Sequence, residues 1–344
     1  MAKLPLVSII IVDYKKENPY LAECLEAIQR QTYKNFEVIL VTDHPITLPV
    51  RLSCHSDRSG GIFSPSRFIK KSFGHYVGPA QKRDWGAKRA GGEILAFIDD
   101  DAYPNKNWLK NIVRDLSDST IAGVGGPGVT PPGVSWLEEA SGWMSASPLG
   151  AGVNTYRFFP NSRKFVDDYP SMNLAIRRSD FLAVGGYDSN YWPGEDTKLC
   201  LDIVTKLKKK IIYDPEVLVY HHRRPLWKPH LRQNGSFGLH RGFFARVLPQ
   251  TSRKLIYFMP SLLLLGLIFI IFSPAIVIAR RYSDVAIYCF VLYLVALLFN
   301  GFWIFRKSGK ITQAVLSIPV VFLTHLWYGA RFLQGFFLTS KLMR

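Results

Sequence analysis

The sequence has few cysteines, and no signal peptide is expected. The 344-residue chain contains four cysteines, at positions 24, 54, 200 and 289, without the paired spacing of a disulfide framework or a zinc site. Reduced thiols, as in a cytosol-facing protein, are therefore expected. The apolar run from Leu6 to Val12 is too short for the apolar region of a signal peptide and instead predicts a strand.

Acidic residues are scarce in the C-terminal two-fifths of the chain. Residues 255–344 contain one acidic and eight basic residues, and residues 204–254 contain two and twelve. Residues 1–203 hold 23 of each sign, so the formal net charge of +17 arises entirely after residue 203. This asymmetry predicts an anionic partner for the C-terminal part alone.

Three long apolar runs indicate that this partner is a membrane. Residues 256–279 and 285–305 contain no charged side chain, and residues 311–337 are interrupted only by His325 and Arg331. Each run is long enough to cross about 30 Å of hydrocarbon. The sequence therefore predicts three spans and contacts with membrane lipids, and it argues against nucleic acid, the competing partner of a basic chain.

The distribution of basic residues predicts an orientation for these spans. Arg246, Arg253 and Lys254 precede the first span, and residues 306–310 supply three more basic residues between the second and third. Basic residues favour the cytoplasmic side, although residues 280–281 oppose this bias. We expect a multi-pass protein of the cell membrane with its N-terminal part in the cytoplasm and its C-terminus across the membrane.

The N-terminal part alternates strand and helix patterns. Residues 7–12, 36–41 and 94–98 read as buried strands, and residues 21–28 and 80–90 as helices. Repeated units of this kind predict an α/β fold with a mostly parallel sheet and helices on both faces. Ligands of such sheets bind beyond the carboxyl ends of the strands, where Asp43 and residues 99–101 fall.

The expected organisation has three segments. Residues 1–225 form the α/β domain, residues 226–255 an amphipathic helix at the membrane interface, and residues 256–344 the membrane domain. Residues 123–152 are rich in Gly, Pro and Ser, which predicts long loops near a ligand.

Asp99, Asp100 and Asp101 follow the strand at residues 94–98. Three adjacent carboxylates repel one another, and a hard divalent cation would relieve this repulsion while binding a phosphate. A solvated acidic turn is the alternative for an isolated triplet of this kind.

Several separated motifs resemble one family, the family 2 glycosyltransferases with a GT-A fold. The resemblance covers roughly residues 5–225, and the tail resembles the membrane-bound branch that builds polysaccharides or lipid-linked glycans. The motifs are VSIIIVDY, QTYKNFEVILVTD, GPAQKRDWGAKRAGGEILAFIDDD, NLAIRRSDFLAVGGYD and GEDTKLC. The resemblance implies transfer of a sugar, with inversion, from a nucleotide sugar in the presence of Mn²⁺ or Mg²⁺.

The resemblance also implies residues that bind the nucleotide. Asp43 matches the residue that contacts the base, typically uracil, so a UDP-sugar is expected as donor. Asp100 matches the ribose contact. The remaining matches are Asp13 and Tyr14 in the turn after the first strand, and Arg83 of the family's Arg-Asn pair. The sequence departs from the pattern at Val12, where the family often has Thr, and at Asp84, where it has Asn.

The metal ligands and the catalytic base are assigned in the same way. Asp99 and Asp101 match the family's metal motif, and His221 is either a third ligand or a surface histidine. Asp196 matches the base that deprotonates the acceptor hydroxyl. Its neighbour Glu195 is the other candidate, or it holds an arginine.

Four further residues complete the candidate site. Asn173 lies in a strand-like stretch where the family approaches the donor. Arg232, Gln233 and Arg241 suit a diphosphate, on the donor or on a polyprenyl acceptor, or else lipid headgroups.

The predicted activity is transfer of a sugar to a hydroxyl of a lipid-linked or growing glycan. One alternative is a polyprenyl-phosphate glycosyltransferase, whose already ionised acceptor needs no base. Another is a membrane protein that binds sugar nucleotides without turnover.

Overall fold

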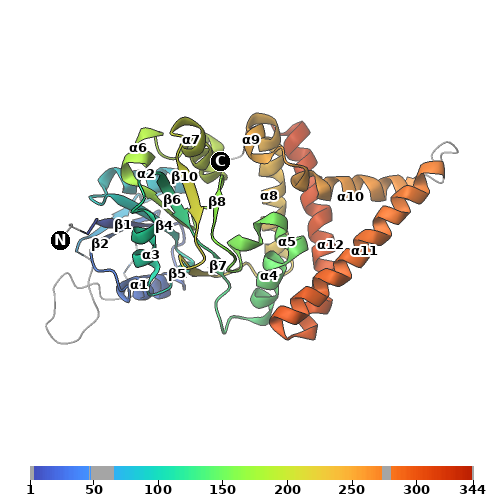
Figure 1. Ribbon diagram of the computed structural model, residues 1–344, viewed down its shortest axis with the longest axis horizontal. Coiled ribbons are helices and arrows are strands. Elements are labelled where there is room, and N and C mark those ends of the chain that lie inside the picture. The colour runs from blue at the N-terminus through green and yellow to red at the C-terminus, as the bar shows by residue number, and fades with distance from the viewer. Residues whose placement is uncertain (1–3, 46, 48–65, 273–279, 343–344) are drawn as a thin grey trace. The chain divides into compact units, whose positions relative to one another are not determined.

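The computed structural model describes residues 4–45, 47, 66–272 and 280–342 (Figure 1). The chain forms two compact units. The first comprises residues up to Val129 together with Phe159–His222, and the second comprises Thr130–Phe158 together with the chain from Arg223 onward. This division differs from the expected continuous segment 1–225, because residues 130–158 belong with the C-terminal helices. The functions expected of the three segments remain predictions.

An eight-stranded sheet forms the centre of the first unit. Its strand order is β3-β2-β1-β4-β9-β6-β10-β8, with β9 and β8 antiparallel to their neighbours. The strands are β1 (Val7–Asp13), β2 (Phe36–Thr42), β3 (Phe68–Ser72), β4 (Ile94–Asp99), β6 (Ile121–Gly125), β8 (Lys164–Val166), β9 (Asn173–Arg177) and β10 (Lys210–Tyr213). The predicted mixed, mostly parallel α/β fold is confirmed. Strand β3 was not predicted from the sequence, because it is an edge strand without a buried apolar run.

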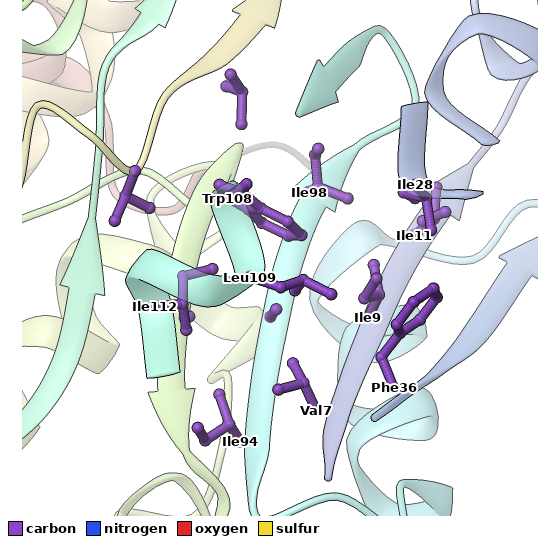
Figure 2. Packing of buried hydrophobic residues seen from close by; sticks show 14 of the residues in the cluster. Val7, Ile9, Ile11, Ile28, Phe36, Ile94, Ile98, Trp108, Leu109 and Ile112 are labelled. Atoms are coloured by element: carbon purple, nitrogen blue, oxygen red, sulfur yellow. The ribbon is translucent and has the colours of Figure 1, made fainter. Parts of the chain in front are cut away.

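Helices cover both faces of this sheet. They are α1 (Leu21–Gln29), α2 (Pro79–Arg89), α3 (Trp108–Asp115), α6 (Arg178–Ala183) and α7 (Glu195–Lys206). Figure 2 shows Val7, Ile9 and Ile11 of β1 packed with Ile28 of α1 and Leu109 of α3. These β1 residues share one face because strand side chains alternate.

The opposite face receives α2. A Cβ atom on Gly86 would lie 2.9 Å from Ile10 Cγ2, so the missing side chain lets α2 approach β1 closely. Lys82 and Arg83 lie on this helix and are therefore held at a fixed height above the sheet.

A small second sheet brings the end of β4 near a distant segment. It has the order β5-β11-β7, from β5 (Ala102–Pro104), β11 (Val219–His221) and β7 (Gly128–Val129). The antiparallel register of β11 and β5 pairs His221 with Ala102, directly after the aspartate triplet.

The second unit is helical. It contains α4 (Trp136–Ala146), α5 (Pro148–Ala151), η1 (Gly152–Arg157), α8 (Lys228–Val247), α9 (Pro249–Ser252), α10 (Leu255–Phe272), α11 (Arg280–Ser308), α12 (Ile311–Leu333) and η5 (Gln334–Leu338). The prediction of long loops over residues 123–152 is wrong, since β6, β7, α4 and α5 occupy much of this stretch. Ser135 caps α4 by accepting a hydrogen bond from Glu138 N, and Ala140 and Met144 pack on Val320 and Val321 of α12.

Three helices in the described part of the chain are long and apolar enough to cross a membrane. They cover Leu255–Phe272, Val285–Ser308 and Ile311–Leu338. The predicted apolar stretches are thus helical, except that residues 273–279 of the first lie outside the described residues. Residues 226–255, predicted to be amphipathic, form α8 and α9 and then begin α10.

Candidate active site

A cluster of metal-ligating side chains lies at the carboxyl end of β4. The ligand atoms of Asp99, Asp101 and His221 all lie within 4.8 Å of one another. His221 Nε2 is 3.1 Å from Asp101 Oδ1, and the adjoining His222 N donates to the Asp101 carbonyl oxygen at 3.0 Å. Carboxylate oxygens with one imidazole suit Mn²⁺ or Mg²⁺. His221 as a metal ligand remains a prediction with which this geometry is compatible.

The carboxylate of Asp100 contacts a different set of groups. It accepts a hydrogen bond from Asn18 Nδ2, which also reaches Asp13 Oδ1 at 3.4 Å. Burial, followed by the nearby carboxylates of Asp101 and Asp13, raises the pKa of Asp100 to about 9. The three adjacent aspartates therefore contact two different sets of groups, and Asp100 contacts the segment that follows β1.

A buried lysine that sequence reasoning missed joins the ends of β1 and β2. Lys82 Nζ lies 2.9 Å from Asp43 Oδ1 and donates to the Asp13 carbonyl oxygen at 2.8 Å. Burial lowers the pKa of Lys82, and the nearby Asp43 opposes this shift. Tyr14, by contrast, is half exposed beside them. A lysine in a helix of basic and small residues reads as a surface residue, so only its unusual burial could have revealed it.

Two carboxylate oxygens near Lys82 are buried without a hydrogen bond from the described protein, Oδ2 of Asp13 and Oδ2 of Asp43. The other oxygen of Asp43 accepts from Lys82 and from Val77 N, the latter at 2.9 Å. A buried carboxylate oxygen without a partner is costly. These two atoms are therefore suited to accept hydrogen bonds from a polar ligand such as a base or a ribose.

Arg83 joins the metal-ligating cluster to the start of α7. Its Nη2 lies 2.9 Å from Asp99 Oδ1 and its Nη1 lies 2.9 Å from Glu195 Oε1. The other oxygen of Glu195 accepts from Gly194 N at 2.9 Å. Glu195 therefore holds an arginine, which was one of the two roles considered for it from the sequence.

Asp196, the neighbouring carboxylate, accepts hydrogen bonds from backbone groups. It accepts from Ser171 N at 3.3 Å and from Thr197 N at 2.7 Å, and within the described part of the chain no cationic side chain forms a hydrogen bond with it. Burial, and then the charges of Glu195 and Asp168, raise its pKa to about 7. A carboxyl group with such a pKa can accept a proton near neutral pH.

Asn173 is placed differently from the expected donor contact. Its Oδ1 accepts from Trp108 Nε1 at 2.8 Å, and its Nδ2 donates to the carbonyl oxygens of Gly126 and Val217, each at 2.7 Å. The side chain is 1 % exposed. In this geometry Asn173 cross-links strands beneath the site.

Arg232, Gln233 and Arg241 lie on α8 in the second unit. Arg232 is exposed, and Arg241 donates to Ser252 Oγ at 3.1 Å and stacks on Tyr257. Arg232 and Arg241 are separated by about two and a half helical turns, so they project from opposite sides of α8. This arrangement does not support the binding of one diphosphate by all three residues.

The first unit is thus an α/β domain of GT-A type with carboxylates at the carboxyl edge of its sheet. The sequence model of the family described as Glycosyl transferase family 2 matches residues 8–181. The chain therefore belongs to this family. The resemblance seen in the sequence is confirmed.

Curated relatives include archaeal and bacterial glycosyltransferases. A glucosyl-dolichyl phosphate glucuronosyltransferase of Haloferax volcanii is 25 % identical over 62 % of this chain and 68 % of its own length. A dolichyl N-acetyl-α-D-glucosaminyl phosphate 3-β-D-2,3-diacetamido-2,3-dideoxy-β-D-glucuronosyltransferase of Methanococcus voltae is 24 % identical. That match covers 79 % of this chain and 85 % of the relative. The pre-mycofactocin glycosyltransferase of Mycobacterium tuberculosis is 27 % identical over 48 % of this chain, which spans only 34 % of that relative.

A solved structure supports the fold assignment. The mannosyltransferase PcManGT of Pyrobaculum calidifontis, in complex with GDP-Man and Mn²⁺, has a TM-score of 0.55 and 16 % identity, with 98 % of this chain and 88 % of that chain covered.

Proposed function

We propose that this protein transfers a sugar, with inversion, from a nucleoside diphosphate donor to a hydroxyl of a lipid-linked glycan at the cytoplasmic face of the cell membrane. The observation that carries the proposal is the arrangement around Arg83, whose guanidinium links Asp99 of the metal-ligating cluster to Glu195 beside Asp196. Donor and acceptor chemistry are thereby brought to one edge of the sheet.

Asp99, Asp101 and His221 would hold Mn²⁺ or Mg²⁺. When bound, the cation supplies Lewis acidity to the leaving diphosphate. The structurally similar mannosyltransferase PcManGT was solved in complex with Mn²⁺, which supports manganese as the first ion to test.

The base and ribose of the donor would bind beside Asp13, Asp43, Lys82 and Asp100. The two unpaired oxygens of Asp13 and Asp43 are acceptors for the N–H and O–H groups that a nucleoside offers. The buried ammonium of Lys82 keeps Asp43 oriented. A UDP-sugar is the proposed donor, and a GDP-sugar is the competitor to test beside it.

Asp196 would remove the proton of the acceptor hydroxyl. Glu195 is held by Arg83 and cannot accept a proton without weakening this ion pair, whereas Asp196 has hydrogen bonds only from backbone N–H groups among those found in the described residues. Direct attack by the activated hydroxyl on the sugar inverts the anomeric centre.

Two observations support a lipid-linked acceptor. The Haloferax and Methanococcus relatives are named for dolichyl-phosphate-linked sugars. The second unit has an apolar groove of about 440 Å³, lined by Leu231, Leu323, Leu326 and Trp327, which suits an isoprenoid or acyl chain. The helices of this unit would anchor the protein in the membrane and concentrate such an acceptor near the site.

The full-length protein in detergent or nanodiscs should transfer sugar from one nucleotide sugar to a glycolipid only when Mn²⁺ or Mg²⁺ is present. Asp196→Asn should abolish this transfer while donor binding, measured by thermal stabilisation, persists. If Asp196→Asn retains most of the rate with a polyprenyl phosphate as acceptor, the enzyme is the polyprenyl-phosphate type. If no nucleotide sugar binds or is turned over, the proposal fails.

A further inference from the structure

The segment that follows α6 contains two glycines in left-handed backbone conformations. Gly185 has a φ of 90° and Gly186 a φ of 77°, which residues with a Cβ atom rarely adopt. A Cβ atom on Gly186 would lie 2.7 Å from Asp84 Oδ1 of α2. The same oxygen accepts a hydrogen bond from Tyr187 N at 2.9 Å. This turn therefore fixes the backbone of Tyr187 against α2.

The ring of Tyr187 is packed on several sides. It meets the rings of Phe97 of β4 and Phe181 of α6 edge to face, with centroids 5.3 and 5.4 Å apart. The guanidinium of Arg83 lies over the same ring, 5.7 Å from its centroid. Only 4 % of Tyr187 is exposed. Because these contacts hold the ring, they also hold its hydroxyl group in one place.

The hydroxyl of Tyr187 forms a hydrogen bond with the hydroxyl of Ser171. The two oxygens are 2.8 Å apart, and either can donate. Burial raises the pKa of Tyr187 well above its usual value, so the phenol stays protonated near neutral pH. Ser171 is buried in the turn before β9, where Asn173 N donates to the Pro170 carbonyl oxygen at 3.4 Å. The hydroxyl pair therefore ties this turn to the segment after α6.

The backbone of the same serine contacts the candidate base. Ser171 N donates to Asp196 Oδ2 at 3.3 Å, whereas Asp196 Oδ1 accepts from Thr197 N, its neighbour in α7, at 2.7 Å. In the part of the chain that the structure describes, Ser171 is thus the one hydrogen-bond donor to this carboxylate from outside α7. The position of Ser171 therefore sets the direction of Asp196 Oδ2.

We propose that Tyr187 and Ser171 are positioning residues of the transfer reaction, which hold the carboxylate of Asp196 in the orientation needed to remove a proton. This inference rests on the proposed function, in which Asp196 is the base. The connection runs from the Tyr187 hydroxyl to the Ser171 hydroxyl, and from Ser171 N to the carboxylate. A general base must lie within hydrogen-bond reach of the proton that it takes, so a small displacement lowers the rate.

Tyr187→Phe isolates the hydroxyl, because the variant keeps the ring that Arg83, Phe97 and Phe181 contact. It is assayed as the full-length protein in nanodiscs, with a nucleotide sugar and a glycolipid acceptor. The value of kcat should fall by about tenfold to a hundredfold, as expected for a misplaced catalytic group. The KM for the nucleotide sugar should stay the same, since Asp196 acts on the acceptor.

Ser171→Ala removes the other half of the same hydrogen bond. It should lower kcat as Tyr187→Phe does, and the double variant should lose no more than either single variant, because all three lack one and the same contact. If the two losses multiply in the double variant, the residues act independently, which overturns the proposal.

The pH profile of kcat/KM provides a second measurement. The charged and titratable groups that face Asp196 are Glu195 of the same helix, Asp168, Arg83 and Tyr187. The hydrogen bond from Ser171 N favours the ionised form of Asp196, so loosening this bond raises the pKa of the carboxyl group. The midpoint of the profile should therefore move to higher pH in Tyr187→Phe. An unchanged midpoint together with an unchanged kcat contradicts the proposal.

Tyr213→Phe is the matched control. This tyrosine of β10 is also buried, and its hydroxyl accepts a hydrogen bond from Asn161 N at 3.1 Å. The control should lose thermal stability, as Tyr187→Phe does, but keep the wild-type kcat and pH midpoint. If the wild-type enzyme transfers sugar and the two variants behave alike, the positioning role is wrong while the proposed function stands. If the wild-type enzyme transfers no sugar from any donor, both fail.

Discussion

Arg83 and Glu195, 112 residues apart in the chain, form a buried ion pair with 2.9 Å between Nη1 and Oε1. The same guanidinium binds Asp99 at 2.9 Å through Nη2. The planar fork of arginine can satisfy two carboxylates at once, which a lysine ammonium does less rigidly. The ion pair therefore sets the distance between the metal-ligating cluster and the first turn of α7.

Replacement of this arginine tests the link. Arg83→Met leaves Glu195 buried without a cation and should destabilise the first unit by about 3 kcal/mol. Arg83→Lys should be more stable than Arg83→Met, because it keeps a cation beside Glu195. Its kcat/KM should still fall at least about tenfold, which corresponds to a loss of about 1.4 kcal/mol of transition-state stabilisation. The control is Arg89→Lys, whose side chain stacks on Trp85 on the outer part of the same helix. Thermal unfolding and steady-state kinetics are the measurements, and an unimpaired Arg83→Lys enzyme would contradict the link.

The pH dependence of transfer should report on Asp196. Burial and the charges of Glu195 and Asp168 raise its pKa to about 7, and a general base must be unprotonated to act. The value of kcat/KM should therefore fall about tenfold per pH unit below about 7 and level off above it. Asp168→Asn removes one of the raising charges and should move the midpoint to lower pH. A profile that is flat between pH 5 and 8 would exclude this role.

Loss of a metal-ligating side chain should weaken Mn²⁺ binding. Asp101→Asn and His221→Ala each remove a member of the three-residue cluster and should lower the affinity by about tenfold or more, as even indirect ligand contacts contribute that much. His222→Ala is the matched control, because that ring stacks on Tyr20 at 3.9 Å and pairs with Glu23. Free Mn²⁺ is followed by electron spin resonance. Equal affinities for His221→Ala and the control would show that His221 is not a ligand.

The close packing of α2 on the sheet predicts a sensitive position. Gly86→Ala would place a Cβ 2.9 Å from Ile10 Cγ2 and should cost about 1–3 kcal/mol, since a packed core resists added volume. Gly78→Ala at the start of the same helix meets only Gln81 Oε1 at 3.9 Å and should be close to neutral. The two variants are compared by thermal unfolding, and equal stability would show that α2 can shift freely.

Strong local patterns made much of the fold predictable. Runs of apolar residues mark β1 and β2, helical spacing of Leu21, Cys24, Leu25 and Ile28 marks α1, and charge-free runs mark α10 and α11. The edge strand β3 was not predicted because it has no buried apolar run, and the helix α4 was not predicted because its partner α12 is distant in the chain. Composition around α4 resembles a loop, and only packing on α12 makes it a helix.

The candidate site divides in the same way. The aspartate triplet stands out in the sequence because adjacent like charges need a cation, and its place after a strand puts it at a sheet edge. Lys82 did not stand out, because a lysine is ordinarily solvated and its burial depends on Asp13 at the end of β1 and Asp43 directly after β2.

What the sequence determined alone is the α/β class, the location of the acidic cluster and the apolar character of the C-terminal helices, since these follow from residues close together in the chain. The tertiary structure decided which of the adjacent carboxylates Glu195 and Asp196 holds Arg83, and it brought His221 beside Asp101. It also set α8 against α12. Such choices depend on the register of strands and on which faces of helices meet, and contacts across more than a hundred residues leave no local pattern.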